Sequence, residues 1–409
     1  PLGIELRADG LAAVMLAATA LVGALVTLQG IAARGSARPA SSFFPLWLFG
    51  WAALDALVLS ADVFNLYVTL ELATLAAIGL VAAGGDRPAV SAALRYLLFA
   101  LPGSLVYVLG VAILYGLYGA LDVSTLGARM ATSAPAVTAA SLMTAGLCLK
   151  AALFPFHAWP LPAYANAPPL ASGLLSALLG KGAFYVLLRL WLDLFPARFE
   201  AWIGLVLGAL SAGAILWGSL QALWQPRLRM VIAYSSAAHT GYLAMGLALG
   251  TERAWSGSVY VAISHAAAVA SMFLAAGTIS RTLGHDRVDE LAGLAHRLPR
   301  TFVALALAGT NAMGMPPSGG FVGKWLLVRA AIETGRWWSA AVMLIGGLLA
   351  AGYVFRFLRG AFLPLPPGTP VHPVAPEGDL AAVALAVIAV VLGIVPGAGL
   401  ALLGARGAP

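Results

Sequence analysis

Long apolar runs follow one another along the whole chain, separated by short polar or Pro/Gly-containing connections. Each run has about the 20 residues that a helix needs to cross the hydrocarbon core of a bilayer. Ten-residue alternating strands of a membrane barrel do not fit such runs, and backbone polar groups cannot stay unpaired in lipid. The pattern therefore predicts twelve transmembrane helices, over residues 10–33, 43–62, 65–84, 92–118, 136–156, 167–190, 200–221, 227–248, 254–278, 301–328, 337–359 and 379–404.

The composition supports this interpretation, with 61% hydrophobic and 10% charged residues in a chain of 409. The expected fold class is an all-α polytopic membrane protein, a single membrane domain over residues 1–409 with no soluble domain. The first run is too long, and has too little basic sequence before it, to be a cleaved signal peptide.

The net charge of +7 raises the question of nucleic-acid binding, but the arginines are scattered over loops rather than clustered. Membrane topology accounts for them better, because cytoplasmic loops are enriched in Lys and Arg. The loops after the odd-numbered runs hold twelve of the twenty arginines, namely Arg34, Arg38, Arg87, Arg95, Arg227, Arg229, Arg281, Arg287, Arg297, Arg300, Arg356 and Arg359. This bias predicts that those loops face the cytoplasm and that both termini face outward.

The lysines are distributed differently from the arginines, because all three lie within or at the edge of apolar runs: Lys150, Lys181 and Lys324. A charge at the bilayer centre costs between about 2.5 and 17 kcal/mol, depending on the method, so each lysine needs a partner, water or a function. A buried ammonium can lose its proton, whereas a guanidinium cannot. The alternative, that the side chain reaches the headgroups from a helix end, is strongest for Lys324.

Other titratable groups also fall within apolar runs. Glu71, in "DVFNLYVTLELATLAAIGL", is a possible partner for a buried lysine, and Asp62 is expected at the interface. His157, His239 and His265 could relay protons near neutral pH. No two of these groups have the spacing of metal ligands on one helix, and Cys148 is the only cysteine, so neither a metal nor a cofactor is expected.

Two runs are interrupted. Pro155 and Pro160 interrupt the fifth run, and Pro316 and Pro317, in "GMPPSGG", interrupt the tenth. Unwound backbone at membrane depth survives only where protein or water satisfies it. Breaks five runs apart predict two inverted five-helix repeats, over residues 43–195 and 200–359, between a leading helix at 10–33 and a closing helix at 379–404.

Several of these segments together resemble a known family. "LKAALFPFHAWPLPAYANAPPLASGLLSALLGKGAFYVLLRL", "RLRMVIAYSSAAHTGYLAMGLAL" and "LAGLAHRLPRTFVALALAGTNAMGMPPSGGFVGKWLL", with "DVFNLYVTLEL" upstream, are similar to the antiporter-like proton-translocating membrane subunits. That family includes the D subunit of Mrp-type Na⁺/H⁺ antiporters, the M and N subunits of complex I and membrane-bound hydrogenase counterparts. The opening "PLGIELRADGLAAVML" most resembles the Mrp D subunit and its hydrogenase counterparts.

The resemblance implies roles for the candidate residues. Glu71 would pair with Lys150 in a first half-channel, Lys181 would lead toward the centre, His239 and His265 would lie on a central polar axis, and Lys324 would belong to the second half-channel. It also implies other membrane subunits as partners, protons as cargo with Na⁺ left open, and a bacterial or archaeal cell membrane as the location. Relatives usually carry a lysine where this chain has Val269, and usually have fourteen spans, so the first two are expected to be missing or lost.

Three classes of function remain open from the sequence. The first is a proton-conducting subunit of a larger complex. Within this class the D subunit of an Mrp antiporter is the preferred interpretation, and complex I-like, hydrogenase and inorganic-carbon uptake assemblies are the alternatives. The chain has no redox-centre motif, so any electron transfer would occur in partner subunits, and the chain alone is not expected to be an enzyme. The second class is a stand-alone secondary carrier, and the third is a structural subunit.

Overall fold

The computed structural model describes residues 4–33, 39–195, 200–364 and 379–404. Within these ranges the chain is helical, with three isolated β-bridges and no strand longer than a bridge. The predicted all-α membrane fold is thus confirmed. Two of the arginines used to predict the topology, Arg34 and Arg38, lie outside the described residues.

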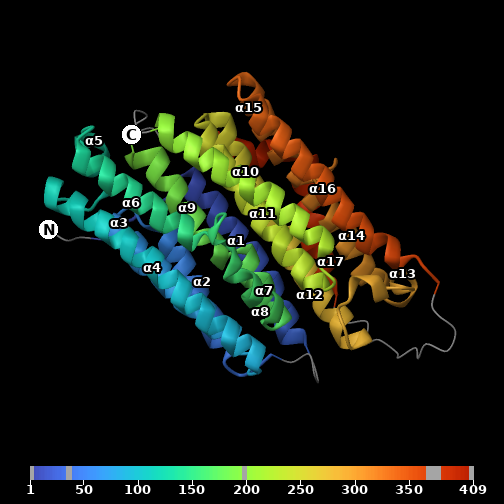
Figure 1. The fold of residues 1–409 in the computed structure, drawn as a ribbon. Coiled ribbons are helices and arrows are strands. Elements are labelled where there is room, and N and C mark those ends of the chain that lie inside the picture. Colours follow the sequence, from blue (N-terminus) through green and yellow to red (C-terminus); the bar gives the residue numbers. More distant parts are fainter. Residues whose placement is uncertain (1–3, 34–38, 196–199, 365–378, 405–409) are drawn as a thin grey trace.

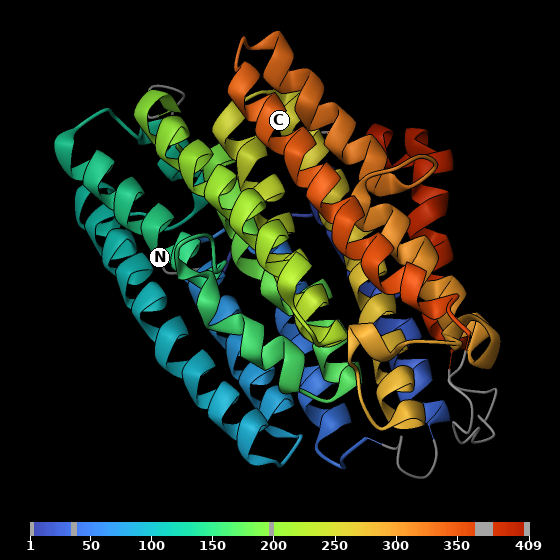
Figure 2. The ribbon, with the colours of Figure 1, turned by 45° about the vertical axis from the view of Figure 1, so that its right-hand side comes forward.

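The helices form one elongated bundle, in which most of the long helices run roughly alongside one another (Figures 1 and 2). In chain order they are α1 (Gly10–Ala32), α2 (Phe43–Leu59), α3 (Val63–Ala82), α4 (Arg87–Tyr118), α5 (Val123–Arg129), α6 (Ala134–Lys150), η2 (Phe156–Ala158), α7 (Pro160–Asn166), α8 (Pro169–Ala177), η3 (Leu179–Lys181), α9 (Gly182–Arg189), η4 (Leu190–Leu194), α10 (Glu200–Trp224), α11 (Leu228–Leu249), α12 (Glu252–Leu283), η6 (Val288–Glu290), α13 (Leu294–Arg297), α14 (Pro299–Met313), α15 (Gly319–Glu333), α16 (Trp337–Ala361), α17 (Leu380–Ile394) and α18 (Pro396–Gly404).

Helix α12 forms the core of the bundle. Every residue from Gly257 to Ile279 is buried, because α12 packs against α8, α11, α14, α15 and α17. The outer helices instead expose large apolar side chains, such as Leu98 and Leu105 on α4 and Leu348 on α16. A helix that is apolar all round and buried in the centre, with apolar faces on the outside, is the arrangement expected of a bundle surrounded by lipid.

Seven helical stretches in the described ranges are long and apolar enough to cross a membrane: Gly10–Ala32, Val63–Ala82, Arg87–Tyr118, Pro169–Leu194, Gly204–Trp224, Glu252–Leu283 and Trp337–Ala361. Three shorter apolar helices add to them, Phe43–Leu59, Ala134–Lys150 and Leu380–Ile394. The chain is therefore an integral multi-pass membrane protein, and the count of twelve spans stays a prediction.

A constant offset in residue number relates the two halves of the chain. Helices α3, α4 and α6 begin at residues 63, 87 and 134, and α11, α12 and α14 begin at 228, 252 and 299, which is 165 residues later in each case. Glycines in the left-handed conformation end α4 and α12 at Gly119 and Gly284, again 165 residues apart. The division into two inverted repeats stays a prediction.

The breaks differ in detail from the sequence prediction. Helix α6 ends at Lys150, before the prolines, and Ala152 has a positive φ of 53°. Pro155 then precedes η2, and Pro160 is the first residue of α7, where its missing N–H costs nothing. Pro316 and Pro317 lie between α14 and α15 as expected.

The sixth run is one membrane-spanning stretch, Pro169–Leu194, whose helical geometry changes along its length. It is divided into α8, the 3₁₀ turn η3, α9 and the π-helical turn η4, and Lys181 ends the 3₁₀ turn. Gly180 allows Tyr164 to pack against this turn, because a Cβ atom there would lie 2.5 Å from the Tyr164 hydroxyl oxygen. The glycines on either side of Lys181 were the available sequence signal.

Helices α4 and α6 cross at two glycines, and this crossing positions Lys150. A Cβ atom on Gly146 would lie 2.8 Å from the amide nitrogen of Tyr107, and one on Gly103 would lie 2.8 Å from Cγ of Lys150. Close backbone approach through small residues is a common way for helices to pack in membranes.

We expect Gly146→Val to push α4 and α6 apart and to lower the melting temperature of the purified protein by several degrees, since overpacking costs about 1–3 kcal/mol. Gly116→Ala, also in a long helix, is the matched control, because nothing lies within 4 Å of the added Cβ. Equal melting temperatures for the two variants, measured in detergent with the partner subunits present, would contradict a tight crossing.

Candidate functional site: a buried axis of lysines, histidines and serines

Lys150 and Glu71 form a buried ion pair between α6 and α3. The Lys150 ammonium contacts the Glu71 carboxylate, and the two side chains are 4% and 21% exposed. Ser104 of α4 completes the group, since its hydroxyl donates to Glu71 and lies 2.9 Å from the Lys150 ammonium nitrogen. The sequence analysis identified both charges but missed Ser104, which was one of many serines in apolar runs.

Lys181 lies between two small cavities. Its ammonium donates to the backbone carbonyl of Ser176 at 2.6 Å. The first cavity, of about 20 Å³, which we call the central cavity, is lined by residues of α7, α8, α11 and α12 and by the turn after α6: Ala151, Ala152, Pro160, Leu161, Tyr164, Ser176, Gly180, Lys181, Ser236, Ala237, His239, Thr240, Leu243 and His265. A space of this size and polarity can hold one water molecule, and it reaches the residues directly after Lys150.

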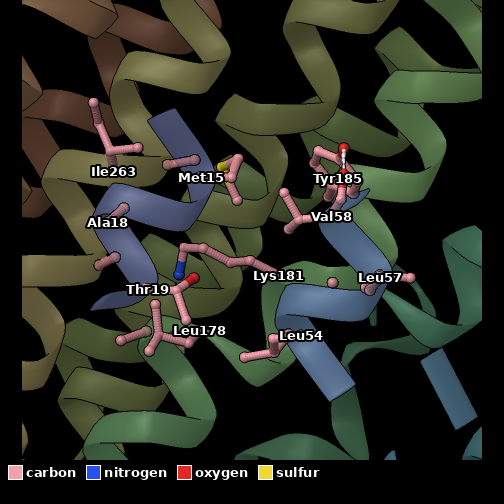
Figure 3. Close-up of a pocket in the computed structure, with 14 residues that line it drawn as sticks. Met15, Ala18, Thr19, Leu54, Leu57, Val58, Leu178, Lys181, Tyr185 and Ile263 are labelled. Carbon is pink, nitrogen blue, oxygen red and sulfur yellow. Dashed lines mark hydrogen bonds between the residues drawn. The ribbon is translucent and has the colours of Figure 1, made fainter. Parts of the chain in front are cut away.

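The second cavity lies on the other side of Lys181, toward α1 and α2. It also measures about 20 Å³, and we call it the inner cavity. Figure 3 shows the Lys181 side chain extending across it, from the side of α2 toward Thr19 of α1. Lys181 therefore adjoins two water-sized spaces.

Hydrogen bonds lead from Lys181 to two stacked histidines. The Ser176 and Ser236 hydroxyl oxygens are 2.5 Å apart, and the Ser236 hydroxyl is 3.0 Å from Nε2 of His265. The His265 and His239 rings stack in parallel, with centroids 4.0 Å apart and an interplanar angle of 5°.

Each histidine keeps one ring nitrogen free of hydrogen bonds to the described residues. Nδ1 of His239 donates to the Ser235 carbonyl at 2.8 Å, which leaves Nε2 without a partner, and Nδ1 of His265 has none either. Both atoms are buried, and an unpaired buried polar atom is costly unless water or a moving proton uses it.

Lys324 lies beyond the histidines, on α15, with its ammonium turned back to the broken helix. It donates to the carbonyls of Ala312 and Met313, at 2.7 and 3.3 Å. The ammonium also lies over the Tyr242 ring, 4.4 Å from its centroid, and the same ring is 5.8 Å from that of His239. The residue is 7% exposed, so the ammonium is buried in the bundle rather than among headgroups.

Two further candidates take other positions. His157 stacks on Phe154 within the break, with ring centroids 5.4 Å apart, and no hydrogen bond among the described residues connects it to the stacked histidines. Asp62 caps α3, where its carboxylate accepts from the backbone N–H groups of Phe64 and Asn65 at 2.9 and 2.7 Å. Val269, one turn after His265, is fully buried.

The fold and this axis together define a class of protein: a multi-pass helical membrane protein with broken helices and charged groups buried along its centre. The chain belongs to the family described as "NADH:quinone oxidoreductase/Mrp antiporter, TM", whose model matches residues 60–350. It is an antiporter-like membrane subunit of the kind found in Mrp and complex I-like assemblies.

Three known proteins illustrate the relationship. The NADH-quinone oxidoreductase N subunit of Desulforudis audaxviator (strain MP104C) is 37% identical over 92% of this chain and 77% of its own. The Na⁺/H⁺ antiporter D subunit of Bacillus subtilis (strain 168) is 28% identical over 88% of this chain and 74% of its own. A chain in the structure of the Mrp complex from Dietzia sp. DQ12-45-1b shares the fold, with a TM-score of 0.91, 24% identity and coverage of 99% of this chain and 84% of that one.

The Glu71–Lys150 pair should be stabilising only as a pair. We expect Glu71→Gln to lower the free energy of unfolding by about 3–5 kcal/mol, because it leaves a buried ammonium without its carboxylate. Lys150→Met should cost less, since Glu71 is the more exposed partner.

The double variant Glu71→Gln with Lys150→Met should recover most of the loss, because replacing both buried charges is often close to neutral. Thermal unfolding of the four proteins in one detergent measures this. Additive losses in the double variant would show that the two side chains do not act as a pair.

Proposed function

We propose that this chain conducts protons along the buried axis, as one subunit of a larger membrane complex. The observation that carries the proposal is that Lys181, Ser176, Ser236, His265 and His239 all line the central cavity, which has room for one water molecule. Lys181 itself binds the backbone carbonyl of Ser176, so that water would join its ammonium to the hydroxyls of Ser176 and Ser236, which lead to His265 and the stacked His239. Each member donates or accepts a hydrogen bond or stacks on the next, and all are buried. A structural subunit would have no need of this connection.

The proton would start on the ammonium of Lys181. Hydroxyl groups both donate and accept, so the serines and a water in the central cavity could pass it toward His265. Histidine can take up and release a proton near physiological pH, and the stacked rings bring it toward Lys324. Two imidazolium charges at this distance repel, so we expect the pair to hold one proton at a time.

Glu71 and Lys150 would control when that proton moves. Unit charges about 4 Å apart interact by about 4 kcal/mol at an effective dielectric near 20. If the pair opens, or if Lys150 changes its charge, the free energy of a proton on Lys181 changes by a fraction of that amount. Coupling between the ion pair and Lys181 would thus be electrostatic, across the central cavity, which is lined by Lys181 and by the two residues directly after Lys150.

The orientation in the membrane is supported by two equivalent pairs of loop residues. The backbones of Asp62 and Asp122 form an isolated β-bridge in the first repeat, and those of Arg227 and Arg287 form one in the second. Each residue of the second pair is 165 positions after its counterpart in the first. Inverted repeats place these loops on opposite sides of the membrane. By the positive-inside rule the arginines would face the cytoplasm and both termini would face outward, in a bacterial or archaeal cell membrane.

Two kinds of membrane complex are candidates for the assembly that contains this chain. A cation/proton antiporter of the Mrp type, with this chain as its D subunit, is our first proposal. A complex I-like quinone-linked assembly is the second, favoured by the higher identity to an N subunit, 37% against 28%. In either case the cargo would be protons, with Na⁺ moved only if the assembly as a whole exchanges it.

Lys150→Arg separates charge from proton exchange. A guanidinium can keep the ion pair with Glu71 but stays protonated. We expect this variant to assemble and yet to lose proton flux, measured as acidification of vesicles that contain the whole complex. Full flux with Lys150→Arg or with Lys150→Ala would contradict the proposal and leave the structural function standing.

Ser236→Ala removes the hydroxyl that joins Ser176 to His265. We expect at least a tenfold slower proton flux, in line with the contribution of about 10² or more from a positioned proton-transfer group. Ser236→Thr keeps the hydroxyl and should retain most of the flux. Ser211→Ala is the matched control, since Ser211 is buried but donates only within α10, to Leu207. Purification of the whole complex for this flux measurement also identifies its partner subunits, and these decide between the Mrp-type and the complex I-like assembly.

A further inference from the structure

Four side chains form a stripe on the segment that follows Lys181. Lys181, Tyr185, Arg189 and Asp193 come at intervals of four residues through α9 and η4, and residues at that spacing share one face of a helix. The stripe begins at the buried Lys181, and its last member is 21% exposed. It runs from the centre of the bundle to the side of the membrane on which α1 begins, because Arg189 binds Asp9 directly before α1.

The inner cavity connects the first two members of the stripe. Lys181 and Tyr185 both line it, with Met15 and Thr19 of α1 and Val58 of α2 on the facing side (Figure 3). The volume of about 20 Å³ is enough for a water molecule. The Tyr185 hydroxyl points away from Lys181 to the end of α2, where it donates to the Val58 carbonyl at 2.5 Å.

Arg189 does not line the inner cavity, but it binds the hydroxyl of Tyr185, which does. The residue is 6% exposed, and its Nε donates to the Tyr185 hydroxyl at 2.8 Å. Its two terminal nitrogens bind the Asp9 carboxylate at 2.5 and 2.6 Å, and one of them lies 3.3 Å from Asp193. Burial alone would raise the pKa of Asp9, but hydrogen bonds from Arg189 and from the backbone N–H of Ala12 lower it to about 2, so Asp9 stays ionised and keeps the arginine in place.

A further cavity, the outer cavity, lies beyond the guanidinium. It measures about 30 Å³ and is lined by Arg7, Asp9, Arg189, Asp193 and Ser256, among others. Arg7 is 45% exposed at its side chain, so this space adjoins the surface. Tyr185 lines the inner cavity and Arg189 lines the outer one, so the hydrogen-bonded pair of these two side chains stands between the space at Lys181 and the space at the surface.

We propose that this stripe is a gated route between Lys181 and the side of the membrane on which α1 begins, with Arg189 as the gate. A fixed positive charge in a narrow polar passage repels protons and cations, as arginines do in selective pores. The route opens when Arg189 swings away from Tyr185 and Asp9, and the two cavities then join. The use of the route by protons rests on the proposed function, whereas its existence does not.

The competing explanation is that Arg189 only anchors α1 to α9. An anchor needs the ion pair but no route behind it. The two explanations differ in whether a small cation from outside reaches the inner cavity once the charge at position 189 is removed.

The test measures the reaction of Ag⁺ with single cysteines in the assembled complex, in vesicles of both orientations. Cys148→Ala removes the native thiol. Thr19→Cys then probes the inner cavity, Ser256→Cys probes the outer cavity, and Ser211→Cys, buried and lining neither, is the control. Thiols left unreacted are counted by alkylation after denaturation. Each cysteine is combined with Arg189, Arg189→Lys and Arg189→Met.

We expect Ser256→Cys to react quickly from the side where α1 begins in every background. Thr19→Cys should react slowly with Arg189 or Arg189→Lys, and at least about tenfold faster with Arg189→Met, because only methionine removes the repelling charge. If Arg189→Met does not assemble, Arg189→Gln replaces it, since glutamine is also uncharged and should change the rate in the same direction.

Equal rates at Thr19→Cys with and without the charge would overturn the gate, and reaction only from the opposite side would overturn the route. Because Ag⁺ access needs no proton transport, these results are independent of the Lys150 and Ser236 variants. A failure of the proposed proton conduction would leave the accessibility result intact, and the reverse also holds.

Discussion

The cost of removing an ammonium group from water is the constraint on which the rest of this structure depends. Each of the three lysines is buried, and each is held by oxygen atoms at a place where a helix is interrupted. Lys150 ends α6, Lys181 ends a 3₁₀ turn, and Lys324 binds the last carbonyls of α14. Helix C-termini carry free carbonyl groups and partial negative charge, and such carbonyls bind Lys181 and Lys324, whereas Lys150 takes its partners from Glu71 and Ser104 of the neighbouring helices. The helix breaks and the buried lysines are thus structurally linked.

The two halves of the chain stabilise their buried lysines with different partners. With the offset of 165 residues, the position of Glu71 corresponds to Ser236, and that of Ser104 to Val269. In the first half a carboxylate compensates Lys150 and a backbone carbonyl binds Lys181, whereas in the second half backbone carbonyls and the Tyr242 ring hold Lys324. Ser236, which takes the position of Glu71, forms a hydrogen bond to His265 instead. An ion pair resists the movement of either charge, while a lysine held by neutral groups can lose its proton without leaving a counter-ion behind.

Much of the fold and of the site could be predicted from the sequence, for identifiable reasons. Membrane helices can be predicted from the length and apolarity of a run. Charged residues are rare in such helices, which made four candidates easy to identify: Lys150, Lys181, Lys324 and Glu71. The division of the sixth run was missed, because Gly180 and Gly182 are unremarkable in a chain with 46 glycines. Ser104, Ser176 and Ser236 were missed because serine is tolerated anywhere in a membrane helix, and only packing shows which hydroxyls meet. The Asp9–Arg189 pair joins residues 180 positions apart, and no local pattern marks such a contact.

Helix α1 has a place in this arrangement that its sequence did not suggest. It lies outside both proposed repeats, yet it packs against α2, α8, α12 and α17 and supplies Thr19 to the inner cavity and Asp9 to the arginine network. Its position is set at one end by a charge pair and along its length by close packing of Gly23 against Trp47 of α2, which also donates a hydrogen bond to Thr27. A partner subunit that displaced α1 by a small distance would change the surroundings of Lys181 and Arg189 together, without any change in Glu71, Lys150 or the histidines. A helix that carries none of the axis residues can therefore connect the axis to the rest of a complex.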